Sequence, residues 1–357
     1  MRGRTRRGDA GAMTSFVLRR LWLMLLTALA LTLVVFALTN LPPSLEKLAK
    51  SEGSVRMSDE AVASWLDEHG FGQPLLLRYG EWLGVVPGWR SEDGTAGRCI
   101  APGGDPALSP RFCGVLQGEW GTSTVFKRPV LEVIANGLAA TGVLMFWVMV
   151  VMVPGALLVG VLAGMREGSR TDRVLSTASI VTTATPEYVS GVVFIALFAT
   201  SAFGMKWFNG TATSAMDDVT FWNFALPVLT IALYGMGYIA RMTRASMAEV
   251  MTAQYIRTAR LKGVSFPQVV LRHALRNALI APFTVIMLQV PWLLNGVVIV
   301  ETLFNYKGFG WTLVEAAGNN DIDLLLGVSV VSVIVVLLTQ LISDVGYALL
   351  NPRIRLA

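Results

Sequence analysis

Charged and histidine side chains are scarce in this sequence of 357 residues. Asp, Glu, Lys and Arg together make up 15% of the chain, 54% of the residues are hydrophobic, and the mean hydropathy is +0.57. Soluble domains average about 25% charged residues, so this composition excludes an ordinary soluble protein of the same length. The only histidines, His69 and His273, are far apart in the sequence, and we therefore predict no metal site.

Signatures of bond-breaking chemistry are also missing. The sequence contains neither the GxxxxGK[ST] phosphate-binding loop nor the GxSxG nucleophile turn. The glycine pairs Gly235/Gly237 and Gly308/Gly310 lie at the ends of apolar segments, where turns or close helix packing explain them better than phosphate binding. We therefore predict no catalytic residue and no cofactor bound by this chain.

The hydrophobic residues are concentrated in six segments. A helix that crosses a bilayer needs about 20 predominantly apolar residues, and each segment approaches or exceeds that length. The sequence therefore predicts an all-α integral membrane protein with six transmembrane helices and with both termini on the same side. The predicted spans are residues 19–39, 137–164, 174–203, 224–240, 278–300 and 324–342.

Basic residues predict the orientation of these spans. They cluster in the N-terminal tail (1–18), after the second span, in the segment between the fourth and fifth spans (245–277, here called the elbow), and in the C-terminal tail (351–357). Because Lys and Arg in short connections resist translocation, these regions are predicted to be cytoplasmic. A pI near 9.4 would also suit nucleic-acid binding, but topology alone explains charges that flank spans. We predict no nucleic-acid partner.

Residues 40–136 form a predicted external loop that precedes a transmembrane core at 137–350. Gly and Pro recur throughout residues 84–121, although residues 59–83 are predicted to be helical. The only cysteines, Cys99 and Cys113, lie in this loop. Outside a plasma membrane a disulfide is their expected state, and it would stabilise the fold by about 3 kcal/mol. Two unpaired thiols in a mobile insertion are the alternative, because spacing alone does not fix their geometry.

The elbow contains the run YIRTARLKGVS at residues 255–265, followed by LRHALRNALI at residues 271–280. These two runs resemble the EAA-type loop of bacterial ABC importer permeases, and more narrowly that of the first permease subunit of dipeptide and oligopeptide importers. The likeness is weakest at residues 41–60 and 86–116. It extends over most of the chain, through residues 16–21, 73–82, 118–123, 128–130, 300–310 and 344–354.

The resemblance implies a fold like that of type I ABC importers and a division of work among subunits. Two permease subunits would form the pathway in the bacterial inner membrane, two ATPase subunits would bind ATP and Mg²⁺ and hydrolyse the ATP, and an external solute-binding protein would deliver a peptide or similar solute. This chain would be one of the permeases, multi-pass in the lipid bilayer and without enzymatic activity of its own.

The same resemblance implies a coupling helix that contacts an ATPase subunit. Gly263 would allow the turn that follows this helix, because glycine has no side chain to clash. The alternative is a solvated basic helix that only sets topology. The residues implied in coupling are Tyr255, Ile256, Arg257, Thr258, Ala259, Arg260, Lys262, Gly263 and Val264.

Some positions depart from the family pattern. Arg257-Thr258-Ala259 replaces Glu-Ala-Ala, a variant that narrows the resemblance to the peptide-importer permeases. Pro42-Pro43-Ser44 replaces a Pro-Gly-Asp-Pro turn after the first span, so the resemblance does not support helices in the residues that follow. Lys307 and Asn351 replace Pro and Asp, and we interpret both as tolerated changes in loops.

Glu187 is the only charged residue inside the predicted third span. A carboxylate near the middle of a membrane costs several kcal/mol unless it is paired or faces water. In one interpretation Glu187 lines the pathway and attracts a cationic group of the solute. In the other it is protonated, or it pairs with Tyr or Ser side chains between helices. The sequence leaves both interpretations open.

Two other functions remain as alternatives. An ion-driven secondary transporter would be expected to have several acids inside the membrane or two homologous halves, and the sequence has neither. A membrane receptor or scaffold would leave the resemblance of the elbow unexplained.

Permeases that this chain resembles serve importers of peptides, glutathione, nickel chelates, opines and some oligosaccharides, and a peptide is the substrate we predict.

Overall fold

The computed structural model describes residues 5–350 except 55, 92–93, 95–96, 101–104 and 202–205. For residues 5–17, 52, 290–292, 294–296 and 347–350 it describes the backbone but not the side chains. Over the described residues the chain is helical, and extended pairing is limited to two isolated bridges, Arg90 with Gly97 and Thr122 with Pro129. The predicted all-α fold is confirmed. The predicted tail at 351–357 lies outside the described residues.

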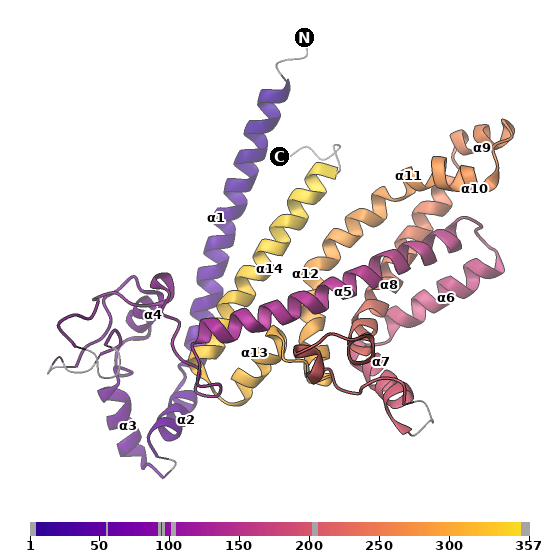
Figure 1. Cartoon of the computed structure of the whole chain (residues 1–357). Coiled ribbons are helices and arrows are strands. Elements are labelled where there is room, and N and C mark those ends of the chain that lie inside the picture. The colour runs from indigo at the N-terminus through magenta and orange to yellow at the C-terminus, as the bar shows by residue number, and fades with distance from the viewer. Residues whose placement is uncertain are drawn as a thin grey trace. The chain divides into compact units, whose positions relative to one another are not determined.

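The chain divides into two compact units. Unit 1 comprises Met1–Arg20, Gly137–Trp311 and Val336–Ala357, and unit 2 comprises Leu21–Asn136 and Thr312–Val335. Four helices contribute residues to both units: α1 (Thr5–Thr39), α5 (Val130–Gly164), α13 (Phe309–Gly318) and α14 (Ile322–Leu350) (Figure 1).

Four of the described helices are long and apolar enough to cross a membrane. They contain the candidate spans Leu18–Thr39, Val130–Gly164, Phe221–Met251 and Ile322–Gly346. Two further candidates are bent pairs, Arg170–Ala184 with Glu187–Ala199 at 103° and Phe266–Ala278 with Ile280–Gln289 at 51°. Counting each bent pair as one span gives six, which agrees with the predicted number.

The third predicted span is not one continuous helix. α6 (Arg170–Ala184) ends at Thr185, which is extended with φ −88° and ψ 121°, and α7 (Glu187–Phe194) begins after Pro186. Proline disfavours the helical conformation of the residue before it, so the break follows from Pro186 itself. Glu187 is therefore the first residue of α7, whereas the sequence prediction placed it near the middle of a single span.

Several helices extend beyond their predicted spans, and α1 and α8 (Phe221–Met251) do so by the most residues. α1 begins at Thr5 rather than at residue 19, and α8 continues eleven residues past the predicted end at residue 240. Hydropathy marks the apolar part of a helix, whereas Arg, Met and Ala favour helix regardless of polarity. Residues 241–251 are rich in these types, so α8 continues into the elbow without interruption.

α8 lies at the centre of unit 1 and packs against α6, α7 and α12 (Ile280–Leu303). Its approach to α6 depends on Gly237, because an added Cβ would lie 2.6 Å from the carbonyl oxygen of Ser179. Gly160 of α5 makes a similar approach, since its Cβ would lie 2.6 Å from the carbonyl oxygen of Ala240. The predicted role of Gly237 in close helix packing is confirmed.

Unit 2 contains three short helices: α2 (Pro42–Glu52), α3 (Asp59–Glu68) and α4 (Leu75–Leu83). The prediction of helix over residues 59–83 holds for α3 and α4, which are separated by a turn with Gly70 at φ +78°. The sequence prediction missed α2, because Pro42-Pro43-Ser44 departs from the turn of the family pattern and left no support for a helix after it. Proline suits the first turn of a helix, and α2 begins at Pro42. Phe36 and Trp82 pack in the core of this unit with Ile322 and Leu326.

The disulfide and a buried aspartate organise the remainder of unit 2. The Sγ atoms of Cys99 and Cys113 are bonded, with their Cα atoms 5.5 Å apart. Asp321 accepts hydrogen bonds from Ser123 Oγ at 2.6 Å and from the Val125 amide at 3.1 Å, and its other oxygen accepts one from the Leu324 amide at 3.2 Å. Asp321 thus caps α14 and holds the turn that precedes α5.

A buried carboxylate joins three helices of unit 1. Glu301 of α12 accepts hydrogen bonds from Thr141 Oγ1 of α5 at 2.5 Å and from the Trp311 amide of α13 at 2.9 Å. The Thr141 hydroxyl in turn accepts from the Phe309 amide at 2.8 Å. Gly308 leaves room for this arrangement, because an added Cβ would overlap the Glu301 carboxylate at 2.1 Å.

We predict that Thr141→Val destabilises the protein, whereas Thr141→Ser does not. Valine keeps the volume but leaves a Glu301 oxygen and the Phe309 amide without their partner, which costs about 1–3 kcal/mol for each buried group. The measurement is the thermal unfolding of the detergent-solubilised protein. Equal melting temperatures for the valine and serine variants would contradict the assigned role of the hydroxyl.

Candidate functional site

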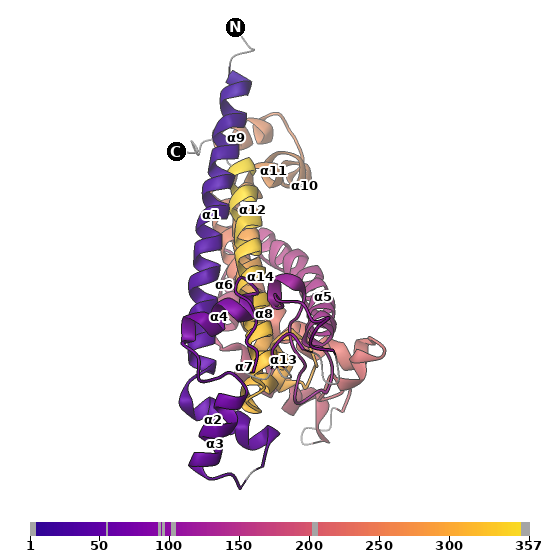
Figure 2. The same ribbon diagram turned by 90° about the vertical axis from the view of Figure 1, so that its left-hand side faces the viewer.

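The elbow is a compact group of short helices between α8 and α12. It consists of the end of α8, then α9 (Gln254–Leu261), α10 (Phe266–Gln268), the π-helical segment η5 (Val269–Ala274) and α11 (Leu275–Ala278). Two views at right angles show α9, α10 and α11 near one another (Figures 1 and 2). All of these residues belong to unit 1.

One face of α9 is buried against the rest of the elbow. Ile256 is 0% exposed and Ala259 is also buried, and both pack in a cluster with Met247 of α8 and with Val269 and Val270 of η5. A helix of eight residues is marginal in water by itself. Its stability and its position therefore depend on this packing.

Gly263 ends α9 in a left-handed conformation at φ +77°. The Gly263 amide donates to the carbonyl of Arg260 at 3.0 Å, and the Val264 amide donates to the carbonyl of Ala259 at 3.2 Å. This pair of bonds is a Schellman motif, which satisfies the last carbonyls of a helix and favours glycine at this position. A Cβ added at Gly263 would have no neighbouring atom of the described residues within 4 Å, so steric crowding does not require glycine here. The positive φ angle is what favours it.

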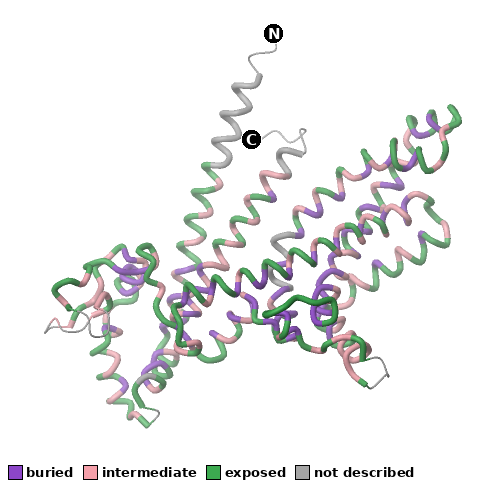
Figure 3. Tube along the Cα trace, in the orientation of Figure 1, coloured by how far each residue is buried: buried purple, intermediate pink, exposed green. Residues whose placement is uncertain are grey.

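The other residues of α9 are exposed (Figure 3), and Arg257 and Arg260 among them are basic. Arg257, Arg260 and Lys262 are exposed, and so is Leu261, whose side chain is 80% accessible. Tyr255 is also exposed, and its hydroxyl accepts a hydrogen bond from Asn277 Nδ2 at 2.9 Å. Arg and Tyr are enriched at protein interfaces, and a cationic surface with apolar residues suits an acidic protein groove.

A bidentate ion pair fixes α8 to α6 beside the elbow. Arg244 Nε and Nη2 donate to the two carboxylate oxygens of Asp172 at 2.9 and 2.8 Å. Asp172 is only 3% exposed and also accepts from the Gly168 amide and from Ser176 Oγ. A bidentate pair constrains both distance and orientation, so the end of α8 is held firmly against α6.

The two arms of the elbow differ in regularity. α8 is α-helical over 31 residues up to Met251. The return arm contains the π-helical segment η5 and bends by 51° before α12. π-helical turns are uncommon and are often found at functional sites. One arm is therefore a continuous α-helix and the other contains two irregular points.

The other predicted site residues lie elsewhere. Glu187 begins α7, is 8% exposed, and its Oε1 has no hydrogen-bond partner among the described residues. Gln289 of α12 is likewise buried with an unpartnered Nε2 among those residues. Cys99 and Cys113 belong to unit 2. The coupling residues predicted from the sequence are contiguous in α9 and the turn after it, and they do not include Glu187.

Sequence reasoning missed the contribution of Asp172 and Arg244. Arg244 was interpreted only as a topological charge, and Asp172 was not singled out. Ser169 accepts a hydrogen bond from the Asp172 amide at 3.1 Å, so the pattern Ser-x-x-Asp marks the start of α6 as a capping sequence. That signal was available in the sequence, but nothing in it identified Arg244 as the partner from a helix 72 residues away.

Comparison with known proteins assigns the chain to a family. A family model described as binding-protein-dependent transport system inner membrane component matches residues 156–356, which include the whole elbow. A probable peptide ABC transporter permease of Sinorhizobium fredii is 30% identical over 343 residues, covering 95% of this chain and 99% of the relative.

Two further relatives align over similar lengths. The oligopeptide transport system permease AppB of Bacillus subtilis is 27% identical, covering 96% of this chain and 99% of its own. The di/tripeptide transport system permease DppB of Pseudomonas aeruginosa is 30% identical with the same coverage of both chains. The family model spans more than half of this chain, and the relatives align over nearly all of it. This chain therefore belongs to the family of binding-protein-dependent transport system inner membrane components.

Proposed function

We propose that this chain is a permease subunit of an ATP-driven importer and that α9 is its contact with an ATPase subunit. The basic residues of the tails and of the elbow support a cytoplasmic location for these regions, and residues 40–136 would then lie outside. A second permease completes the pathway, and an external binding protein delivers the solute. The observation that carries the proposal is α9, whose apolar face packs on α8 and η5 and whose basic residues Arg257 and Arg260 are exposed.

The elbow has the physical properties that such a contact requires. Ile256 and Ala259 attach α9 to the rest of the elbow, and the Arg244 pair attaches α8 to α6. A displacement of α9 when the ATPase subunits close would therefore move the end of α8 with it. Differential binding of the elbow in two states of the ATPase then shifts the equilibrium between inward-facing and outward-facing forms.

Peptides are the substrate class that we propose. The three relatives named above are described as permeases for peptides, oligopeptides, or di- and tripeptides. A relative from Salmonella typhi, 29% identical, is described as a glutathione transport system permease, and glutathione is itself a short peptide. A short peptide is the chemistry that these descriptions share.

Gly263→Val is predicted to uncouple ATP hydrolysis from uptake. A β-branched residue in the left-handed conformation costs about 1–2 kcal/mol, so the Schellman turn and the exposed face of α9 are displaced. We expect normal membrane insertion but substrate-stimulated ATP hydrolysis and peptide uptake lowered about fivefold or more. The measurement is ATPase activity and uptake by the complete complex in proteoliposomes.

Matched variants separate this effect from a general loss of stability. Gly263→Asn should retain most activity, because asparagine tolerates positive φ. Gly118 has φ +88° and also no neighbour within 4 Å of an added Cβ, but it lies in unit 2 outside the elbow. Gly118→Val should leave coupling intact. Full coupling in Gly263→Val would show that the turn does not transmit ATPase closure.

Glu187→Gln is predicted to leave substrate selectivity unchanged. The burial of Glu187 within one chain favours the interpretation that it acts between helices, since a side chain lining a pathway shared with a second subunit is exposed in the isolated chain. We expect the ratio of uptake rates for a lysine-containing dipeptide and a neutral dipeptide to match the wild type. Selective loss of the lysine-containing dipeptide would instead support a lining role for the carboxylate.

A further inference from the structure

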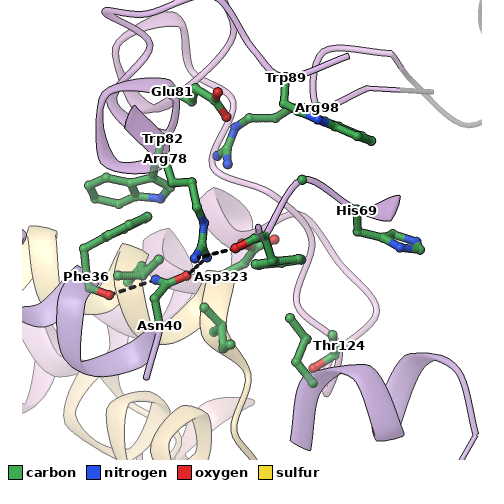
Figure 4. A pocket seen from close by; sticks show the side chains of 15 residues that line it. Phe36, Asn40, His69, Arg78, Glu81, Trp82, Trp89, Arg98, Thr124 and Asp323 are labelled. Atoms are coloured by element: carbon green, nitrogen blue, oxygen red, sulfur yellow. Dashed lines mark hydrogen bonds between the residues drawn. The ribbon is translucent and has the colours of Figure 1, made fainter. Parts of the chain in front are cut away.

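Unit 2 contains a polar pocket that the proposed coupling mechanism does not use. Its volume is about 260 Å³, close to the lower end of the range of about 300–1,000 Å³ for ligand pockets. The pocket lies between α4, the end of α1, the start of α14 and the loop at residues 88–113, which contains the disulfide and is called the hairpin below (Figure 4). Every residue that lines it belongs to unit 2.

The floor of the pocket holds a buried cation. Arg78 of α4 is 8% exposed, and its guanidinium donates to Asn40 Oδ1 and to the carbonyl oxygen of Phe71 at 3.3 Å. The ring of Phe71 also lies 4.7 Å from the guanidinium carbon. Both of these hydrogen-bond acceptors are neutral, while the carboxylate of Glu81 acts on the guanidinium electrostatically. A buried arginine whose hydrogen-bond acceptors are neutral is costly unless negative charge lies close to it.

A second cation points into the same space from the hairpin. The guanidinium of Arg98 lies near that of Arg78 in the pocket (Figure 4). Burial lowers the pKa of Arg78, the carboxylate of Glu81 opposes that shift, and the positive charge of Arg98 adds to the lowering to a smaller extent. Two cations that destabilise each other across a pocket create a favourable place for an anionic group.

Two carboxylates of the pocket lining, Glu81 and Asp323, offset the positive charge of Arg98. Arg98 is exposed as a whole residue, but its guanidinium points into the pocket, where desolvation lowers its pKa and the carboxylates of Asp323 and Glu81 oppose that shift. Burial also raises the pKa of Glu81, which the Trp89 amide and the two arginines counteract. The formal charges of the two arginines and the two acids cancel, so a ligand that is neutral overall preserves the balance.

Aromatic rings and solvent access complete the pocket. Trp82 and Phe36 are buried at its floor, and Trp89 lines the side nearest Arg98. His69 and Arg98 are exposed, so the pocket is open to solvent at their side. A planar carboxylate can bind guanidinium groups in a bidentate manner, while an apolar side chain of the same ligand packs on the indole rings.

We propose that this pocket binds the carboxylate of a small zwitterionic solute, such as the C-terminus of a short peptide, between Arg78 and Arg98. Arg78 and Arg98 lie outside the predicted membrane spans, although Phe36 and Leu326 of the lining belong to span ends, and binding here requires neither ATP nor the elbow. The inference therefore does not rest on the proposed transport mechanism, although a peptide site at this place would suit an importer of peptides.

The test is equilibrium binding of the dipeptide Ala-Phe and of its C-terminal amide to the purified full-length chain in lipid nanodiscs without ATP. Loss of a charge-assisted hydrogen bond predicts that the amide binds about ten- to hundredfold more weakly than the free acid. This comparison needs no mutation, so it does not depend on the folding of a variant. Amide binding equal to that of the acid, or no detectable binding of Ala-Phe, would overturn the proposal.

Variants identify the pocket as the place of binding. Arg98→Gln and Arg78→Gln should each weaken Ala-Phe binding about tenfold or more while leaving binding of the amide unchanged. Arg98 is exposed, so its variant is the one that should preserve the fold. Arg111→Gln is the matched control, because Arg111 belongs to the same hairpin but does not line the pocket. Unchanged binding in Arg98→Gln, or equal loss in Arg111→Gln, would contradict the assignment.

Discussion

The burial of Ile256 and Ala259 beneath α9 is the contact on which the proposed function depends. α9 is too short to be stable without neighbours, and these two side chains attach it to α8 and η5. The attachment leaves the basic side of the helix free for a partner. It also means that a force on that side reaches α8 through packed side chains, which have low compressibility.

Buried polar groups make the surrounding helices a firm support for that contact. Asp172 binds Arg244 with both oxygens, and Glu301 joins α5, α12 and α13 through hydrogen bonds with Thr141 and a main-chain amide. Polar groups of this kind are costly when unpaired, so each arrangement favours one packing of its helices. Glycines such as Gly237 and Gly308 permit the close approaches that these bonds require.

Much of the architecture could be predicted from the sequence, because membrane spans depend on local composition. The six apolar segments correspond to four candidate spans that are each one helix and to two bent pairs of helices. Gly263 lies at the turn where the resemblance placed it. The breaks in the helices were harder to predict. Pro186 ended a helix inside an apolar segment, and Pro42 began one, so the same residue type had opposite effects that depend on its neighbours.

Contacts between distant segments were not predictable from a single sequence. Arg244 and Asp172, Glu301 and Thr141, and the arginines of the pocket in unit 2 come together only after folding. Charge counting assigned Arg244 to topology, and the sequence analysis gave Asp172, Arg78 and Arg98 no role. Their neighbours in the sequence do not mark the contacts that these side chains make after folding.

The central claim is that α9 contacts an ATPase subunit, and site-directed photo-crosslinking tests it most directly. Arg257→Cys introduces a single reactive thiol on the exposed face, because the two native cysteines are bonded to each other. A photo-crosslinker attached there, in membranes containing the complete transport complex, is predicted to link this chain to an ATPase subunit with a yield that changes on addition of ATP. Labelling of the same thiol by a membrane-impermeant reagent from outside intact cells, with no crosslink to an ATPase, would contradict the account.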